Sequence, residues 1–157
     1  MRCLILTIVT AGACAAQSQP PTGLPTDAVP LEVQHLLADQ YSGIAEPRRA
    51  VIRDAMSWAA FWKEALNNRT PEAAVPPVDF AREMVIVAAM GRRGTGGYGI
   101  SIEGAYHAPG RIVVAVRQTS PPAGAMTVQV FTAPVDVVRV QRSAEPIAFL
   151  DVGPAPR

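Results

Sequence analysis

Six short segments in the second half of the sequence are typical of β-strands, and no helical pattern lies between them. They span residues 83–90, 98–106, 111–118, 126–133, 135–142 and 146–150. Turn-forming sequences rich in Pro, Gly and Ser separate them. Ile100, Ile102 and Tyr106 alternate with polar residues, and apolar residues recur at every second position in 112–116 and 126–130. This pattern predicts a mainly β (α+β) domain, an antiparallel β-sandwich or a partly open barrel with one packed α-helix.

The packed helix is predicted at residues 57–67, with Ser57 as its N-cap. The apolar residues that fall on one face at helical spacing are Trp58, Phe61, Trp62 and Ala65. Two tryptophans on a short helix are compatible with a ligand platform, but such large rings more often pack in a core. Before the helix, 31–44 has a mixed pattern that suits a short helix or extended chain, and 46–54 contains a short strand.

The first 14 residues have the features of an export signal, because Arg2 precedes an apolar run and then small residues. The sequence that ends at Cys14 resembles the lipobox of bacterial lipoproteins, in which the cysteine is lipidated; ordinary cleavage after Ala13 or Ala15 is the alternative. We therefore expect a protein of the bacterial cell envelope, either periplasmic or a membrane-anchored lipoprotein.

The rest of the chain divides by composition. Residues 15–30 form a predicted Pro-rich linker, 31–152 the β domain and 153–157 a short tail. Both cysteines, Cys3 and Cys14, lie in the export signal, so no disulfide is expected in the β domain.

Charge and motif content give no indication of nucleic-acid binding or catalysis. Lys and Arg total 14 against 13 for Asp and Glu, so nucleic acid is not an expected partner and membrane contact is expected only through Cys14. His35 and His107 are far apart, no nucleophile elbow or H-E-x-x-H motif is present, and Asp136 looks isolated near a strand start. Asp79 is predicted to form a turn. We expect no enzyme activity, metal or cofactor.

A glycine-rich loop at 91–98 follows the first of the six segments. A phosphate-binding loop would need a helix after it, whereas an alternating strand follows here. Two interpretations remain open: a chain reversal with positive φ at Gly96 or Gly97, or an exposed recognition tip. The candidate partner-binding residues are Arg92, Arg93, Thr95, Gly96, Gly97 and Tyr98.

Residues 76–102, PPVDFAREMVIVAAMGRRGTGGYGISI, resemble the C-terminal domain of the PrcB family of bacterial protease complex subunits. The similar features are the helix tryptophans, the V-D-F stretch at 78–80, the T-G-G-Y loop, the turn at 121–124 and the T-x-P strand entry at 132–134. The resemblance covers about 40–150. It implies an exported accessory subunit that binds a protein, such as a protease, without catalysis.

Two other functions stay open. The T-G-G-Y loop is also similar to a loop of chagasin-like peptidase inhibitors, which would insert 91–98 into a protease cleft. A domain that binds a small ligand in the envelope, including an unrecognised enzyme, is the third possibility. We expect an inhibitor to present a protruding wedge, and an accessory subunit to present a broader apolar surface.

Overall fold

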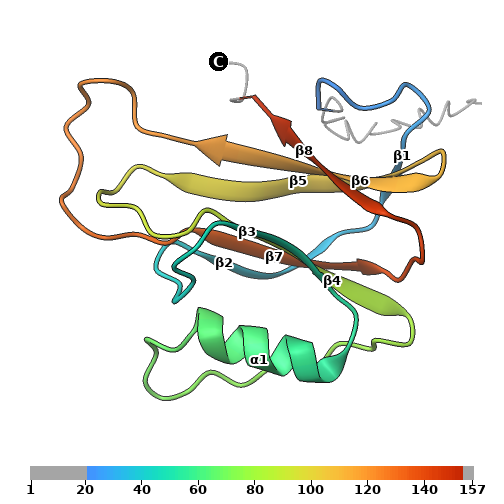
Figure 1. The fold of residues 1–157 in the computed structure, drawn as a ribbon, viewed down its shortest axis with the longest axis horizontal. Helices are drawn as coiled ribbons and strands as arrows, with labels where there is room; N and C mark the ends of the chain where they lie inside the picture. The colour runs from blue at the N-terminus through green and yellow to red at the C-terminus, as the bar shows by residue number, and fades with distance from the viewer. Residues whose placement is uncertain (1–20, 154–157) are drawn as a thin grey trace, which may run out of the picture.

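The computed structural model describes residues 21–153, which form two four-stranded sheets and one helix in three layers (Figure 1). The elements are β1 (Val29–Leu31), β2 (Gln34–Asp39), β3 (Arg48–Ile52), α1 (Ala55–Ala65), β4 (Glu83–Ala89), β5 (Gly99–Ala108), β6 (Arg111–Thr119), β7 (Val135–Gln141) and β8 (Ile147–Val152). One sheet has the order β1-β5-β6-β8 and the other β2-β7-β4-β3. All pairs are antiparallel except β6 and β8. The predicted β-sandwich with one helix is confirmed, and the sheets do not close into a barrel.

The space between the sheets is filled by the inward side chains of four strands. These are Met84, Ile86 and Ala88 of β4, Val138 and Val140 of β7, Ile102 and Ala105 of β5, and Ile112, Val114 and Val116 of β6. Ile112, Val114 and Val116, spaced two residues apart, therefore form one buried face of a strand, as predicted. The remaining residues of β4 face the helix, so this strand is covered on both sides and is apolar almost throughout.

Helix α1 covers the outer face of the sheet β2-β7-β4-β3. Trp58, Phe61, Trp62 and Ala65 are buried there against Val85, Val87, Val135 and Val137. The indole N–H of Trp58 donates to the carbonyl of Pro76 at 2.9 Å, and that of Trp62 to Ala73 at 3.2 Å. Core packing of the aromatic face is confirmed. Within residues 21–153 no helix is long and apolar enough to cross a membrane.

The predicted N-cap of the helix is wrong. Asp54 has the extended cap conformation, and its Oδ1 accepts the backbone N–H of Ser57 at 2.8 Å. The helix begins at Ala55, two residues before the predicted start. An aspartate is as good a cap as a serine, and here it lies directly after the turn that leaves β3.

The strand predicted at 126–133 is also wrong. Residues 126–131 pair with no strand, and Thr132 and Ala133 form only isolated bridges, to Arg93 and Tyr41. The segment lies in the connection that crosses from β6 in one sheet to β7 in the other, and both strands already have two neighbours. No edge is left for it beside them.

The N-terminal part of the domain is extended rather than helical. β1 begins at Val29, inside the segment expected as a linker, and β2 follows it. The predicted export signal with Cys3 and Cys14, residues 15–20 of the linker and 154–157 of the tail lie outside the described residues.

Candidate functional site

Four loops meet at one end of the sandwich, at the left of Figure 1. They are the segments 40–47, 66–70, 91–98 and 120–134. Hydrogen bonds join them: the backbone N–H of Arg92 donates to Ala45 at 2.8 Å, and that of Arg93 donates to Thr132 at 2.7 Å. This end, which we call the loop end, contains all of the candidate residues predicted in 91–98.

The glycine-rich loop 91–98 is held by its neighbours along most of its length. The N–H of Gly96 donates to Val128 at 2.9 Å, and the hydroxyl of Thr132 donates to the carbonyl of Thr95 at 3.1 Å. Gly91 and Gly97 have positive φ, 72° and 88°, so the prediction for Gly97 is confirmed while Gly96 lacks this conformation. The loop is a packed support for residues 126–132 rather than a free tip.

The two arginines of the loop point to different surroundings. Arg93 is half-buried: one terminal nitrogen donates to the carbonyl of Met90 at 2.9 Å, and its guanidinium carbon lies 5.6 Å from the ring centre of Tyr98. Its Nε is buried without a hydrogen-bond partner among the described residues. Arg92 is exposed, with its guanidinium carbon 4.2 Å from the ring centre of Phe131. Arg92 therefore presents its donors to solvent, whereas Arg93 fastens the loop.

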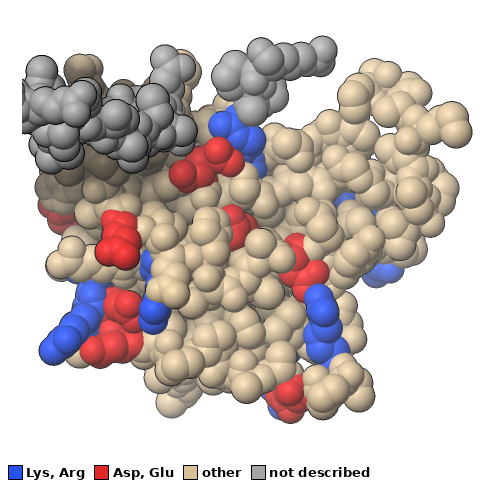
Figure 2. Space-filling model, turned by 180° about the vertical axis from the view of Figure 1, so that it is seen from behind, with Lys and Arg blue, Asp and Glu red and all other residues tan. Residues whose placement is uncertain are grey.

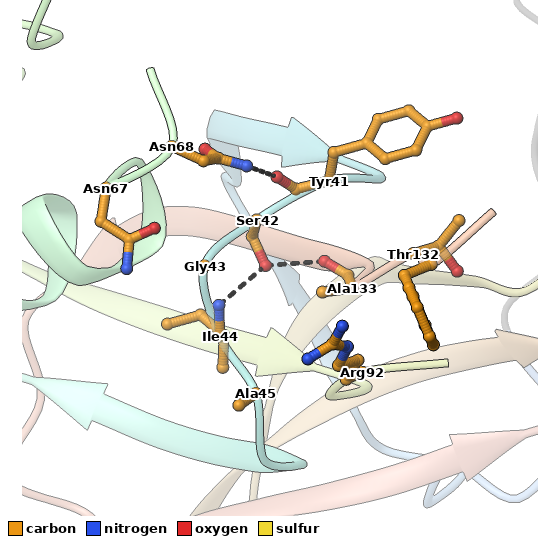
Figure 3. A pocket seen from close by; sticks show the side chains of 11 residues that line it. Tyr41, Ser42, Gly43, Ile44, Ala45, Asn67, Asn68, Arg92, Thr132 and Ala133 are labelled. Carbon is orange, nitrogen blue, oxygen red and sulfur yellow. Dashed lines mark hydrogen bonds between the residues drawn. The ribbon is translucent and has the colours of Figure 1, made fainter. Parts of the chain in front are cut away.

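A surface hollow of about 400 Å³ lies beside Arg92 (Figure 3). It is lined by Tyr41, Ser42, Gly43, Ile44, Ala45, Asn67, Asn68, Arg92, Phe131, Thr132 and Ala133. Arg92 is the one charged residue in this lining. The hydroxyl of Ser42 donates to the carbonyl of Ala133 at 2.6 Å, which ties the 41–45 loop to the entry of β7.

Gly43 brings the 41–45 loop against the C-terminal end of α1. Its N–H donates to the carbonyl of Ala65 at 2.8 Å. A Cβ at this position would lie 2.3 Å from the carbonyl oxygen of Glu64 and 2.4 Å from Oδ1 of Asn67. Only glycine allows this approach, so the shape of the hollow depends on it.

Large apolar side chains are exposed on the loops of this end, two of them, Tyr41 and Phe131, in the lining of the hollow. Met126 is 102% exposed, Val128 71%, Phe131 62% and Tyr41 51%, and Val130 is also exposed. We call these five residues the exposed apolar cluster. Residues 118–134 contain no charged residue. In Figure 2, where the loop end lies at the right, the upper lobe correspondingly shows no charged side chain on the visible face.

Residues 84–141 match the model of the PrcB C-terminal family. The match runs from β4 to the end of β7, and thus includes the 91–98 loop and most of the exposed apolar cluster. It confirms the predicted resemblance and indicates a role related to a subunit of a protease complex. No curated protein and no solved structure matches the chain significantly.

The PrcB segment also contains a buried carboxylate that sequence reasoning treated as isolated. Asp136 is 2% exposed; its Oδ1 lies 3.0 Å from Nδ1 of His35, and its Oδ2 accepts the N–H of Ile102 at 2.7 Å. The register of β5 shifts just after Ile102, between it and Gly104. Asp136 therefore satisfies a backbone donor at this irregularity and links the two sheets, and the prediction of an isolated acid is wrong.

The other acids and histidine lie away from the loop end. His107 approaches Glu145 at 3.1 Å near the opposite end of the sandwich, and Oδ1 of Asp79 accepts the N–H of Ala81, as expected of a turn former. No group of three or more possible metal ligands occurs among residues 21–153.

Sequence reasoning missed Tyr41, Phe131 and the asparagines of the hollow. Phe131 was assigned to a strand that does not form, and Tyr41 to an extended end with no role. One signal was available: a long stretch, 118–134, that is apolar in places and has no charge at all. An uncharged connection of this length is uncommon on a surface that faces only water.

Proposed function

We propose that this chain is a non-catalytic protein-binding module, an accessory or assembly subunit of an exported protease complex, and that it docks through the loop end. One observation supports this above all: the exposed apolar cluster. Apolar side chains that gather on one surface typically mark a protein interface. Aromatic residues, Met and Arg, which are enriched in interfaces, are the types found here.

The cluster offers a substantial driving force for association. Full burial of a Val, Phe or Met side chain contributes roughly 1.5–3 kcal/mol. In the isolated domain Met126, Val128 and Phe131 gain little of this, because they remain largely in water. A partner that covers them would recover it.

The same geometry favours an accessory subunit over a wedge-like inhibitor. An inhibitor that used 91–98 would need this loop to project, but Gly96 and Arg93 are bonded to Val128 and Thr132. The residues that extend outward from it are those of 126–131. This matches the broad apolar surface expected of a subunit interface.

Site-specific photo-cross-linking in the native host tests the docking surface. A benzoylphenylalanine at position 131 should give a discrete adduct, and mass spectrometry should identify a protease or another subunit of its complex. The same probe at Arg111, an exposed residue at the β5–β6 turn, is the matched control. Equal adducts from both positions, or none at 131, would contradict docking at the loop end.

Export is part of the proposal and rests on the sequence of the first 14 residues. Mass spectrometry of the protein purified from its host should show a chain that begins at Cys14 with a diacylglyceryl group, or a chain cut after Ala13 or Ala15. A Cys14→Ser variant should lose the lipid mass. Recovery of an intact Met1 would contradict export.

A further inference from the structure

We infer that the hollow beside Arg92 binds a carboxylate carried by a short extended peptide segment of the partner. This inference rests on the proposed function, since it concerns the same loop end. It adds the chemistry of what is bound: a carboxylate, supplied either by an acidic side chain or by a free C-terminus.

The charge of the hollow supports an anionic group. Arg92 is its one charged lining residue, and the flanking segments 40–45 and 118–134 contain no acid. Within the described residues the guanidinium of Arg92 makes no hydrogen bond or ion pair. The ring of Phe131 lies 4.2 Å from it, which restricts where it can move. A planar guanidinium held in this way is suited to a bidentate pair with a carboxylate.

Several acceptors around the hollow are already used, which disfavours a cationic ligand. At the end of α1 the carbonyls of Ala65 and Leu66 accept the N–H groups of Gly43 and Arg69 at 2.8 and 3.0 Å. The hydroxyl of Ser42 both donates to Ala133 and accepts the N–H of Ile44. An ammonium group would also be repelled by the positive charge of Arg92, whereas a carboxylate would find the unused donors of that side chain.

The other side of the hollow supports a peptide rather than a small free anion. Figure 3 shows Asn67 and Asn68 across the Ser42–Ile44 backbone from Arg92. The side chain of Asn67 makes no hydrogen bond within the described residues. A carboxamide carries both a donor and an acceptor, as a peptide group does, so it can pair with a backbone that crosses the hollow. The exposed rings of Tyr41 and Phe131 supply apolar contacts at its rim.

A titration with four short peptides tests the inference. The ¹⁵N-labelled domain is titrated with Ac-Ala-Val-Phe-Ala bearing a free C-terminus, the same peptide amidated, Ac-Ala-Val-Glu-Ala-NH₂ and Ac-Ala-Val-Gln-Ala-NH₂. We expect at least one carboxylate-bearing peptide to shift the amide resonances of Gly43, Ile44 and Arg92. It should bind about tenfold more tightly than its neutral counterpart, because a charge-assisted pair is added. The pair that shows the difference identifies the source of the carboxylate.

Variants locate the effect. Arg92→Gln should remove the preference for the carboxylate peptide, and Arg92→Lys should retain only part of it, because the bidentate geometry is lost. Arg111→Gln, at the opposite end, is the matched control and should leave the preference intact. Equal binding of charged and neutral peptides, or a preference that survives Arg92→Gln, would overturn the inference.

The result is distinguishable from that of the proposed function. If the peptide preference is absent while cross-linking from position 131 persists, the loop end docks a protein but the hollow does not select a carboxylate. If the preference is present while cross-linking from 131 fails, the hollow binds carboxylates and the apolar docking surface is wrong.

Discussion

Residues 112–116 and 126–130 both have an apolar residue at every second position, but their environments are opposite. In β6, Ile112, Val114 and Val116 are at most 1% exposed, whereas Met126 and Val128 are 102% and 71% exposed. β6 pairs with β5 and β8 and faces β4 and β7 across the core; 126–130 pairs with no strand. Apolar residues at every second position thus show that one face of a segment can be covered. They do not show what covers it, and for 126–130 nothing among residues 21–153 does.

The largest expected effect separates these two segments directly. Val114→Asp should unfold the domain, because an unpaired carboxylate in the core costs several kcal/mol, comparable to the whole stability of a domain of about this size. Val128→Asp should change the free energy of unfolding by less than about 0.5 kcal/mol, as is usual for exposed positions. Urea denaturation followed by tryptophan fluorescence measures both.

The effect of Val128→Asp on partner binding tests the same comparison of the two segments. The folded variant should lose the cross-linked adduct formed from position 131, because the charge lies within the apolar surface that the partner covers. A strong loss of stability in Val128→Asp would contradict the exposed position of this side chain.

The next effect tests whether the 91–98 loop supports the exposed segment. Gly97 has φ 88°, and a Cβ there would lie 3.2 Å from Pro121, at the start of the 120–134 connection. Gly97→Val should therefore destabilise the domain by about 1–3 kcal/mol, since a β-branched residue is strained at positive φ.

Gly94→Val is the matched control for Gly97→Val. At Gly94 no atom lies within 4 Å of the Cβ position, and φ is not in the positive region. Its substitution should therefore leave the melting temperature nearly unchanged when both variants are unfolded by heat. Similar melting temperatures for the two variants would refute the idea that the backbone conformation at 97 fixes the loop.

Most of the fold could be predicted because local patterns and the final packing agree. The strands around 102 and 114 and the aromatic face of α1 follow from periodicity, and the strand around 85 from a short apolar run followed by a glycine-rich loop. The strand at 126–133 could not be corrected from sequence, because its absence depends on β6 and β7 already having two neighbours each. That is a property of topology, which a local pattern does not contain.

The candidate site was predictable only in part, for a related reason. The 91–98 loop is visible as a glycine-rich break between strands. Its companions Tyr41, Asn67 and Phe131 come from three other loops, and only the folded chain brings them to one hollow. Asp136 illustrates the same limit, since its partners His35 and Ile102 lie 101 and 34 residues away in sequence.

A smaller effect is expected at the anchor of the exposed segment. Thr132→Val keeps the shape of the side chain but removes the hydrogen bond to Thr95, which should cost about 1 kcal/mol. Amide hydrogen exchange should become faster in 94–98 and 127–132, with little change in β6. Faster exchange throughout the sandwich would instead mean that Thr132 stabilises the whole fold.

The smallest effect distinguishes the two adjacent arginines. Arg92→Ala removes an exposed side chain and should alter the free energy of unfolding by less than about 0.5 kcal/mol. Arg93→Ala should cost about 0.5–1 kcal/mol more, because its bond to Met90 and its contact with Tyr98 lie in the half-buried base of the loop.

Binding should show the reverse order, with Arg92 the more sensitive position, because its donors face the hollow. Calorimetric unfolding of the two single variants, beside the cross-linking yield from position 131, measures both orders. If Arg93→Ala is as stable as Arg92→Ala, the contacts of Arg93 with Met90 and Tyr98 do not hold the loop 91–98. The loop would then move together with the 126–131 segment. It could not be what holds that segment in place.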